Sequence, residues 1–238
     1  MDNSIYATLT RQSGLMQEMQ VIANNIANAS TTGFRSEGVM FSEYVKAIGP
    51  DSPSLSMAQA SVRDTAMVQG TLTQTGGTFD LAIEGDGFFL IDTPAGQRLT
   101  RAGAFGPNEN GDLVTADGHR VLDAGGAPVF VPQGVDSVGI SADGTVSADG
   151  QPIGQIGLVA PIDPNGMVRE SGVLFDAQGG FEPVADPRMV QGFLEGSNVD
   201  PILQIARMIE VQRAYELGQN FLDNEHERVR GVIQAIRR

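Results

Sequence analysis

The chain has 238 residues, with 29 acidic and 15 basic side chains, a formal net charge of −14 and no cysteine. The negative charge argues against nucleic-acid backbones and anionic membrane surfaces as partners, since both are negatively charged themselves. The lack of cysteine excludes a disulfide framework and thiolate chemistry. There is no apolar run of about 18 residues, and residues 1–20 lack the basic segment and apolar core of a signal peptide. We therefore expect neither a transmembrane helix nor a cleaved signal.

Charge and composition divide the chain into two neutral ends and an acidic centre. Residues 1–36 and 197–238 are each neutral, whereas residues 37–196 hold 21 acidic and seven basic side chains. The same centre holds 26 of the 30 glycines and 11 of the 12 prolines. We interpret this partition as two modules, one of which is built from both ends of the chain.

The first expected element is a helix over residues 3–28. Apolar side chains recur there at alternating spacings of four and three, with Gln12 as one polar member, and this pattern is typical of a helix packed against another helix. The alternative is that the stripe packs onto the central domain. The residues expected to face the partner helix are Ile5, Leu9, Met16, Met19 and Ile26.

Residues 37–78 are expected to form a connector. An apolar start, residues 41–45, could form a short helix, which the following Gly49-Pro50 pair would end. The rest is rich in Ser, Thr, Gln and Gly, so we expect extended or irregular backbone there.

Residues 79–196 have the pattern of a mainly-β domain. Short apolar runs alternate with Asp-Gly and Asn-Gly pairs, which favour the positive φ angles of tight hairpin turns. This spacing predicts a barrel-like or sandwich domain. The six pairs are Asp86-Gly87, Asn110-Gly111, Asp117-Gly118, Asp143-Gly144, Asp149-Gly150 and Asn165-Gly166.

The last expected element is a helix over residues 201–238. Asp200 can cap its start, and Pro201 suits the first helical position, where no amide donor is needed. Two lines of residues repeat every seven positions, one apolar throughout and one polar in its middle, which predicts a long helix–helix seam. The seam residues expected on this helix are Ile205, Met208, Gln212, Tyr215, Gln219, Leu222, Val229, Ile233 and Ile236.

The sequence offers little support for catalysis or for a bound cofactor. The Asx-Gly pairs do not follow the spacing of a calcium-binding EF-hand loop, and two distant histidines, His119 and His226, do not make a zinc site. We expect no catalytic residue, no cofactor and no metal ligand. An alternative of another class remains open at this point: a carbohydrate- or peptide-binding β domain, or a glycosidase using two of the central carboxylates. The absence of tryptophan, which stacks on sugar rings, weighs against it.

Four stretches of the sequence carry a resemblance to a known family. They are Ala23-Asn-Asn-Ile-Ala-Asn28 with Thr31-Thr-Gly-Phe-Arg35, then residues 79–89, then residues 100–105, and finally Gly196-Ser-Asn-Val-Asp200 leading into residues 208–216. In this order they resemble the flagellar rod and hook axial proteins. The residues that carry the family signature are Asn24, Asn25, Asn28, Gly33, Phe34, Ser197 and Asn198.

Together, the patterns and the resemblance predict an α+β protein with a coiled-coil-like module of paired terminal helices and a central mainly-β domain. The expected boundaries are 1–36 with 197–238 for the helical module, 37–78 for the connector and 79–196 for the β domain. The resemblance implies a non-enzymatic, torque-transmitting subunit of the proximal rod, with the helices inside the tube and the β domain outside. It also implies a place in the basal body across the periplasm. The expected partners are copies of the chain, other rod proteins and the flagellar type III export apparatus, with no nucleic acid or small-molecule substrate. A distal-rod or hook paralogue is the alternative within the family.

Overall fold

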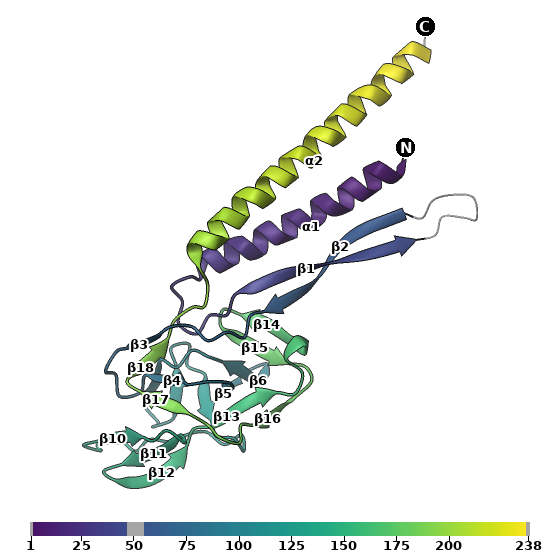
Figure 1. Cartoon of the computed structure of the whole chain (residues 1–238). Coiled ribbons are helices and arrows are strands. Elements are labelled where there is room, and N and C mark those ends of the chain that lie inside the picture. The colour runs from purple at the N-terminus through teal and green to yellow at the C-terminus, as the bar shows by residue number, and fades with distance from the viewer. Residues whose placement is uncertain (1, 47–54, 237–238) are drawn as a thin grey trace. The chain divides into compact units, whose positions relative to one another are not determined.

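The computed structural model describes residues 2–46 and 55–236, which fall into two compact units (Figure 1). The helical unit comprises the described residues of Met1–Ala27, Glu37–Ala66 and Asp200–Arg238. The β unit comprises Asn28–Ser36 and Met67–Val199. The chain therefore has a helix at each end and a mainly-β centre, which confirms the α+β class expected from its sequence.

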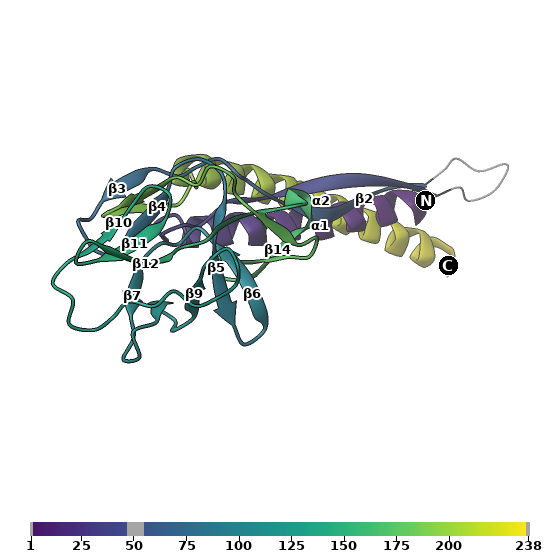
Figure 2. The same ribbon diagram turned by 90° about the horizontal axis from the view of Figure 1, so that it is seen from below.

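The helical unit contains two helices and one β-hairpin. The helix α1 (Asp2–Ala27) lies between α2 (Pro201–Ile236) and the hairpin of β1 (Glu37–Lys46) and β2 (Leu55–Thr65), as Figure 1 shows. Figure 2 shows the same elements from below. At about 1.5 Å per residue, α1 is roughly 39 Å long and α2 roughly 54 Å. The expected cap of α2 is confirmed, because Asp200 Oδ1 accepts hydrogen bonds from the amides of Ile202 and Leu203 at 2.9 and 3.2 Å.

The hairpin replaces the short helix that the apolar start of the connector suggested. Residues 37–46 pair with residues 55–65 in antiparallel register, with a bulge between Met40 and Phe41. Residues 47–54, which include the Gly49-Pro50 pair, lie outside the described residues. A short helix was the wrong expectation here, because β-strand pairing satisfies the backbone of both segments over their whole length.

The β unit contains sixteen short strands and one 3-10 turn among its described residues. Its largest sheet runs in the order β14-β15-β6-β5-β9-β8-β7, with β13 and β16 attached beside β5. Smaller sheets are β10-β11-β12, β17-β4 and β18-β3. The bounds are β3 (Leu72–Gln74), β4 (Leu81–Ile83), β5 (Phe88–Thr93), β6 (Gly96–Thr100), β7 (Phe105–Pro107), β8 (Leu113–Thr115), β9 (Arg120–Leu122), β10 (Val138–Ile140), β11 (Thr145–Ala148), β12 (Gln151–Gln155), β13 (Leu158–Pro161), η1 (Pro164–Gly166), β14 (Met167–Ser171), β15 (Leu174–Ala177), β16 (Phe181–Pro183), β17 (Met189–Gln191) and β18 (Phe193–Glu195).

The strand β5 is the centre of the β unit's core. Its successive side chains point to opposite faces of the sheet, as the two-residue period of a strand requires. Phe89 and Ile91 enter one apolar cluster, whereas Phe88 and Leu90 enter a second. All four are at most 3% exposed, so β5 is buried on both sides, and a continuous apolar run is its sequence signature.

Most of the Asx-Gly pairs form the tight turns that they predict. The clearest case is Asp149-Gly150, which joins β11 to β12 with φ of 49° and 77°. Positive φ at both positions is the requirement of a type I′ turn, whose twist matches that of the strands it connects. Asn165-Gly166 differs, because Asp163 caps a 3-10 turn there through a hydrogen bond from the Asn165 amide to its side chain.

Candidate functional site

An apolar cluster joins the two helices of the helical unit. Leu15 and Ile22 of α1 and Val211 of α2 are buried at its centre. The side chains packed around them are Met19, Ile26, Met208, Ala214 and Tyr215. On α1 these contacts recur every three or four residues, as expected for ridges of one helix in the grooves of another.

Two polar contacts lie beside this cluster and fix how the helices are aligned. Gln12 Nε2 donates a hydrogen bond of 2.9 Å to the backbone oxygen of Tyr215, and Arg207 Nε donates one of 2.7 Å to Glu18 Oε1. Gln12 and Glu18 are 7% and 8% exposed, so a shift along the seam would leave both without these partners. A buried polar residue in such a seam specifies register at some cost in stability. The sequence pattern had placed Gln12 in the stripe.

A glycine on α2 makes the close approach of Gln12 possible. A Cβ atom at Gly218 would lie 2.5 Å from Gln12 Nε2, which is closer than atoms can pack. The sequence pattern did not single out Gly218. A glycine inside a predicted helix costs about 1 kcal/mol relative to alanine, so its presence there suggests that another side chain packs closely against it.

The structure brings together only some of the residues assigned to the seam from the heptad pattern. Met19, Ile26, Met208 and Tyr215 lie in the helix–helix cluster. Ile5 and Leu222 are half-buried. The other assigned residues are exposed within the described chain: Leu9, Met16, Ile205, Gln212, Gln219, Val229, Ile233 and Ile236.

Asn25 of the signature attaches the start of the hairpin to α1. Its Oδ1 accepts from the Glu37 amide at 3.0 Å, and its Nδ2 donates to the Glu37 oxygen at 2.8 Å. The buried Asn25 side-chain amide therefore pairs with both the N–H and the C=O of Glu37, as the backbone of a neighbouring strand would. Its Nδ2 also lies 3.3 Å from Gln204 Oε1 of α2, so one residue contacts all parts of the helical unit. Asn24, next to it, is exposed.

The remaining signature residues lie in the β unit, where the two distant signature segments meet. The Asn198 amide donates to the Phe34 oxygen at 3.2 Å, and Asn198 Oδ1 accepts from the Ser36 amide at 2.6 Å. Gly33 adopts φ of +69°, and a Cβ there would lie 2.3 Å from the Ala102 nitrogen. Only glycine combines this backbone conformation with this close approach. Asn28 and Ser197 accept local hydrogen bonds that shape the two turns.

A buried charge cluster holds these segments together. Glu195, at the end of β18, contacts Arg35 at 2.8 Å and Arg101 at 3.2 Å, and all three side chains are at most 3% exposed. Glu195 Oε1 also accepts from the Gly70 amide at 2.9 Å. One carboxylate thus compensates two buried guanidinium groups.

Burial determines the protonation of the two arginines. Loss of hydration lowers the pKa of Arg35, and it lowers the pKa of Arg101 to about 10, with the nearby positive charge of Arg35 as the second cause. Arg101 therefore stays charged at neutral pH, and Glu195 forms salt bridges with both guanidinium groups. No sequence spacing connects residues 35, 101 and 195, so only the resemblance, whose stretches include Arg35 and Arg101, indicated part of this cluster.

A second arginine contact closes the same region of the β unit. The Arg169 guanidinium lies 4.3 Å from the centroid of the Phe34 ring and 4.5 Å from that of Phe175. It also donates to the oxygens of Arg35 and Gly172. Cations are attracted to the faces of aromatic rings, so Arg169 connects Phe34, in the loop of residues 28–36, to the core residue Phe175.

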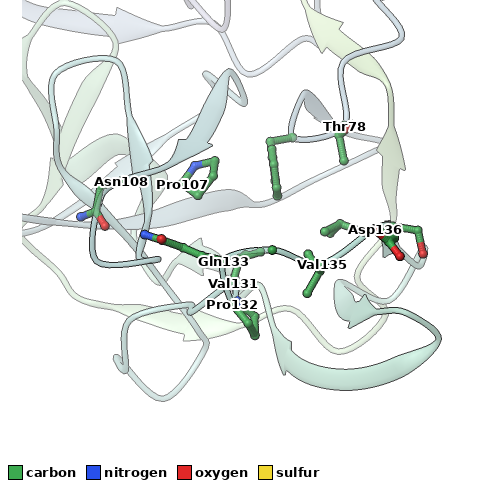
Figure 3. Close-up of a pocket in the computed structure, with 12 residues that line it drawn as sticks. Thr78, Pro107, Asn108, Val131, Pro132, Gln133, Val135 and Asp136 are labelled. Carbon is green, nitrogen blue, oxygen red and sulfur yellow. The ribbon is translucent and has the colours of Figure 1, made fainter.

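The β unit also has an open hollow of about 680 Å³ (Figure 3). Residues 131–138 form one side of it, and Thr78, Phe79, Pro107 and Asn108 form the other. Its lining contains one carboxylate, Asp136, whereas glycoside hydrolysis requires two. Within residues 2–46 and 55–236, no group of three metal-binding side chains comes together. No described helix is long and apolar enough to cross a membrane.

Family models match three parts of the chain. Residues 5–35 match the flagella basal body rod protein model, and residues 82–148 match the D1 domain of flagellar hook protein FlgE/F/G. Residues 190–234 match the C-terminal part of the flagellar basal body rod FlgEFG proteins. The matches include most of α1, the loop of residues 28–35, part of the β unit with the central strand β5, and most of α2. These features define the class: the chain is a structural subunit of the flagellar axial proteins.

Relatives in other bacteria are similar over nearly the whole chain. The flagellar basal-body rod protein FlgF of Caulobacter vibrioides is 38% identical over 99% of this chain and 98% of its own length. FlgF of Mesorhizobium japonicum is 42% identical over 91% of this chain and 90% of its own. The rod protein FlgG of Bacillus subtilis is 31% identical over 98% and 99%. The chain belongs to the FlgF family of flagellar basal-body rod proteins, and it is a structural protein of the basal-body rod and not an enzyme.

Proposed function

We propose that this subunit assembles into the proximal rod through its paired terminal helices. The pairing is coiled-coil-like, and the β unit, a barrel-like or sandwich domain, stands outside the helical tube. The assembly module comprises residues 1–36 and 197–238, with 37–78 as connector and 79–196 as outer domain. Its partners are copies of itself and other rod subunits, and the type III export apparatus delivers it. The assembled helices transmit torque because many packed side chains resist twisting together.

One observation carries this proposal: each terminal helix has more apolar surface than its partner within the chain covers. On α1, Leu15 and Ile22 face α2, whereas Leu9 and Met16 are 48% and 43% exposed. Met16 also lines a groove of about 440 Å³, which Tyr215 of α2 lines from the other side. Exposed apolar stripes of this kind mark protein–protein contacts.

A substitution on the exposed stripe tests the proposal. In a bacterium that depends on this chain, Met16→Asp should abolish swimming and complete basal bodies, because a buried carboxylate without a partner opposes packing. The purified variant should keep its helix content, because Met16 is exposed in the isolated subunit. Asn220→Asp adds the same charge at an exposed polar position of α2 and should leave swimming unchanged. Normal rods with Met16→Asp would contradict this assembly surface.

A further inference from the structure

The C-terminal end of α2 extends beyond α1. Gln12 lies beside Tyr215 and Glu18 beside Arg207, so the two helices run antiparallel. Counting ten residues from Gln12 back to Asp2, the start of α1 falls beside residue 225 of α2. The last 11 described residues of α2, about 16 Å, therefore lie past the end of α1 (Figure 1).

This overhang, residues 226–236, carries an apolar face that continues the helix–helix seam. Val229 and Ile236 follow Tyr215 and Leu222 at heptad intervals, and Val232 and Ile233 flank the same line. Their exposed fractions are 43%, 79%, 55% and 48% respectively. Along this line, the apolar cluster with α1 extends to Tyr215, and residues 226–236 carry the same face past the start of α1.

The opposite end of α2 carries a second uncovered apolar stripe. Ile202, Ile205 and Ile209 recur at intervals of three and four residues, and they are 79%, 49% and 44% exposed. Helical geometry places the centre of this stripe roughly opposite Val211, the buried residue of α2 in the seam. The two stripes have similar length and the same aliphatic chemistry. They lie on different faces at opposite ends of one helix.

We propose that the overhang of one subunit packs against the aliphatic start of the C-terminal helix in an adjacent rod subunit of this family. The contact is head-to-tail, because the two surfaces are different patches on the same helix. Head-to-tail contacts extend into open helical assemblies when their rotation does not close a ring, whereas a self-complementary contact closes as a dimer. The occupant follows from continuity: the overhang continues a face that already binds a helix in the subunit, so another amphipathic helix fits it. The C-terminal family match spans FlgE, FlgF and FlgG, so sister subunits share this part of the chain. This inference rests on the proposed function and names the surface and partner.

Site-specific photocrosslinking in flagellated cells tests the contact. A benzophenone amino acid replaces Ile233, and a matched variant carries it at Gln234, on another face of the same turn. The expected adduct forms at position 233, and mass spectrometry should locate its other end at the start of the C-terminal helix of a rod subunit. An adduct with any other segment, equal adducts from both positions, or none in intact basal bodies would overturn the proposal.

Substitutions separate this inference from the proposed function. Ile233→Asp should abolish complete basal bodies, whereas Gln234→Asp should not. Circular dichroism of purified Ile233→Asp should match that of the parent, because its contacts lie beyond α1. If Ile233→Asp assembles normally while Met16→Asp does not, the overhang contact is wrong and assembly through the helices stands. If both assemble normally, the proposed function fails as well.

Discussion

Replacing Glu195 by glutamine is the most direct test of the buried charge cluster. Glu195→Gln keeps the shape of the side chain and an oxygen that can accept from the Gly70 amide. It removes the carboxylate that forms salt bridges with Arg35 and Arg101, which are 1% and 3% exposed. A guanidinium group stays charged at neutral pH, so the folded β unit would hold two buried positive charges without the carboxylate that pairs with them.

Glu195→Gln replaces one carboxylate oxygen by an amide group, yet the expected loss of folding stability is large. Breaking a buried ion pair by removing one partner costs about 3–5 kcal/mol. For a unit of this size the midpoint of thermal unfolding falls by about 2–4 °C per kcal/mol, so a decrease of about 10 °C is expected. Differential scanning calorimetry of the full-length chain at pH 7 measures it, and circular dichroism confirms that the variant folds.

Another salt bridge of the β unit provides the matched control. Glu170→Gln removes one of the two carboxylates paired with Arg98, and the Glu170 side chain is 44% exposed. Solvent-exposed ion pairs contribute little to stability, so this variant should unfold within a few degrees of the parent. If Glu195→Gln were as stable as Glu170→Gln, burial of the cluster would not have the energetic role assigned to it.

Two further predictions concern the helix seam and the dependence of stability on pH. Gly231→Ala should raise the temperature at which the purified subunit loses helix, because alanine favours a helix by about 1 kcal/mol and a Cβ meets no atom within 4 Å there. Gly218→Ala should lower it, because its Cβ displaces Gln12; equal gains from both would refute the close approach. Arg98 donates a hydrogen bond that holds the pKa of Glu170 below its usual 4.5. This stabilisation is present above pH 4.5 and is lost as pH falls through the lower folded-state pKa. The urea midpoints of the parent and Glu170→Gln should therefore differ most at pH 7 and converge under acid conditions; a difference that grows as pH falls would contradict the sign.

Local patterns in the sequence were sufficient for the ends of elements and for turns. The Asp200 cap of α2 and the Asp149-Gly150 turn depend on residues that are adjacent in the chain, so propensity alone indicates them. The heptad pattern identified both long helices. On α1, it predicted a contact face displaced by about one residue from Leu15 and Ile22, which are buried in the cluster with α2. The displacement arises because each helix carries a second apolar stripe.

Contacts between distant segments could not be predicted in the same way. The hairpin of residues 37–65 forms by pairing two strands whose sequences lack strict alternation, so its signal was weak. Glu195 meets Arg101 across 94 residues of chain, and nothing in either local sequence shows that these charges are buried together. Position in the fold decides whether a charged residue is a solvated surface group or part of the core.

The hydrogen bond between Gly70 and Glu195 has a consequence for how this family can vary. It brings the two ends of the long segment of the β unit, residues 67–199, next to each other. Residues 70–195 therefore form an insertion with adjacent ends. Such a module can be lengthened, shortened or exchanged for another domain while the terminal helices keep their sequence. The same pair of terminal helices could therefore carry different outer domains.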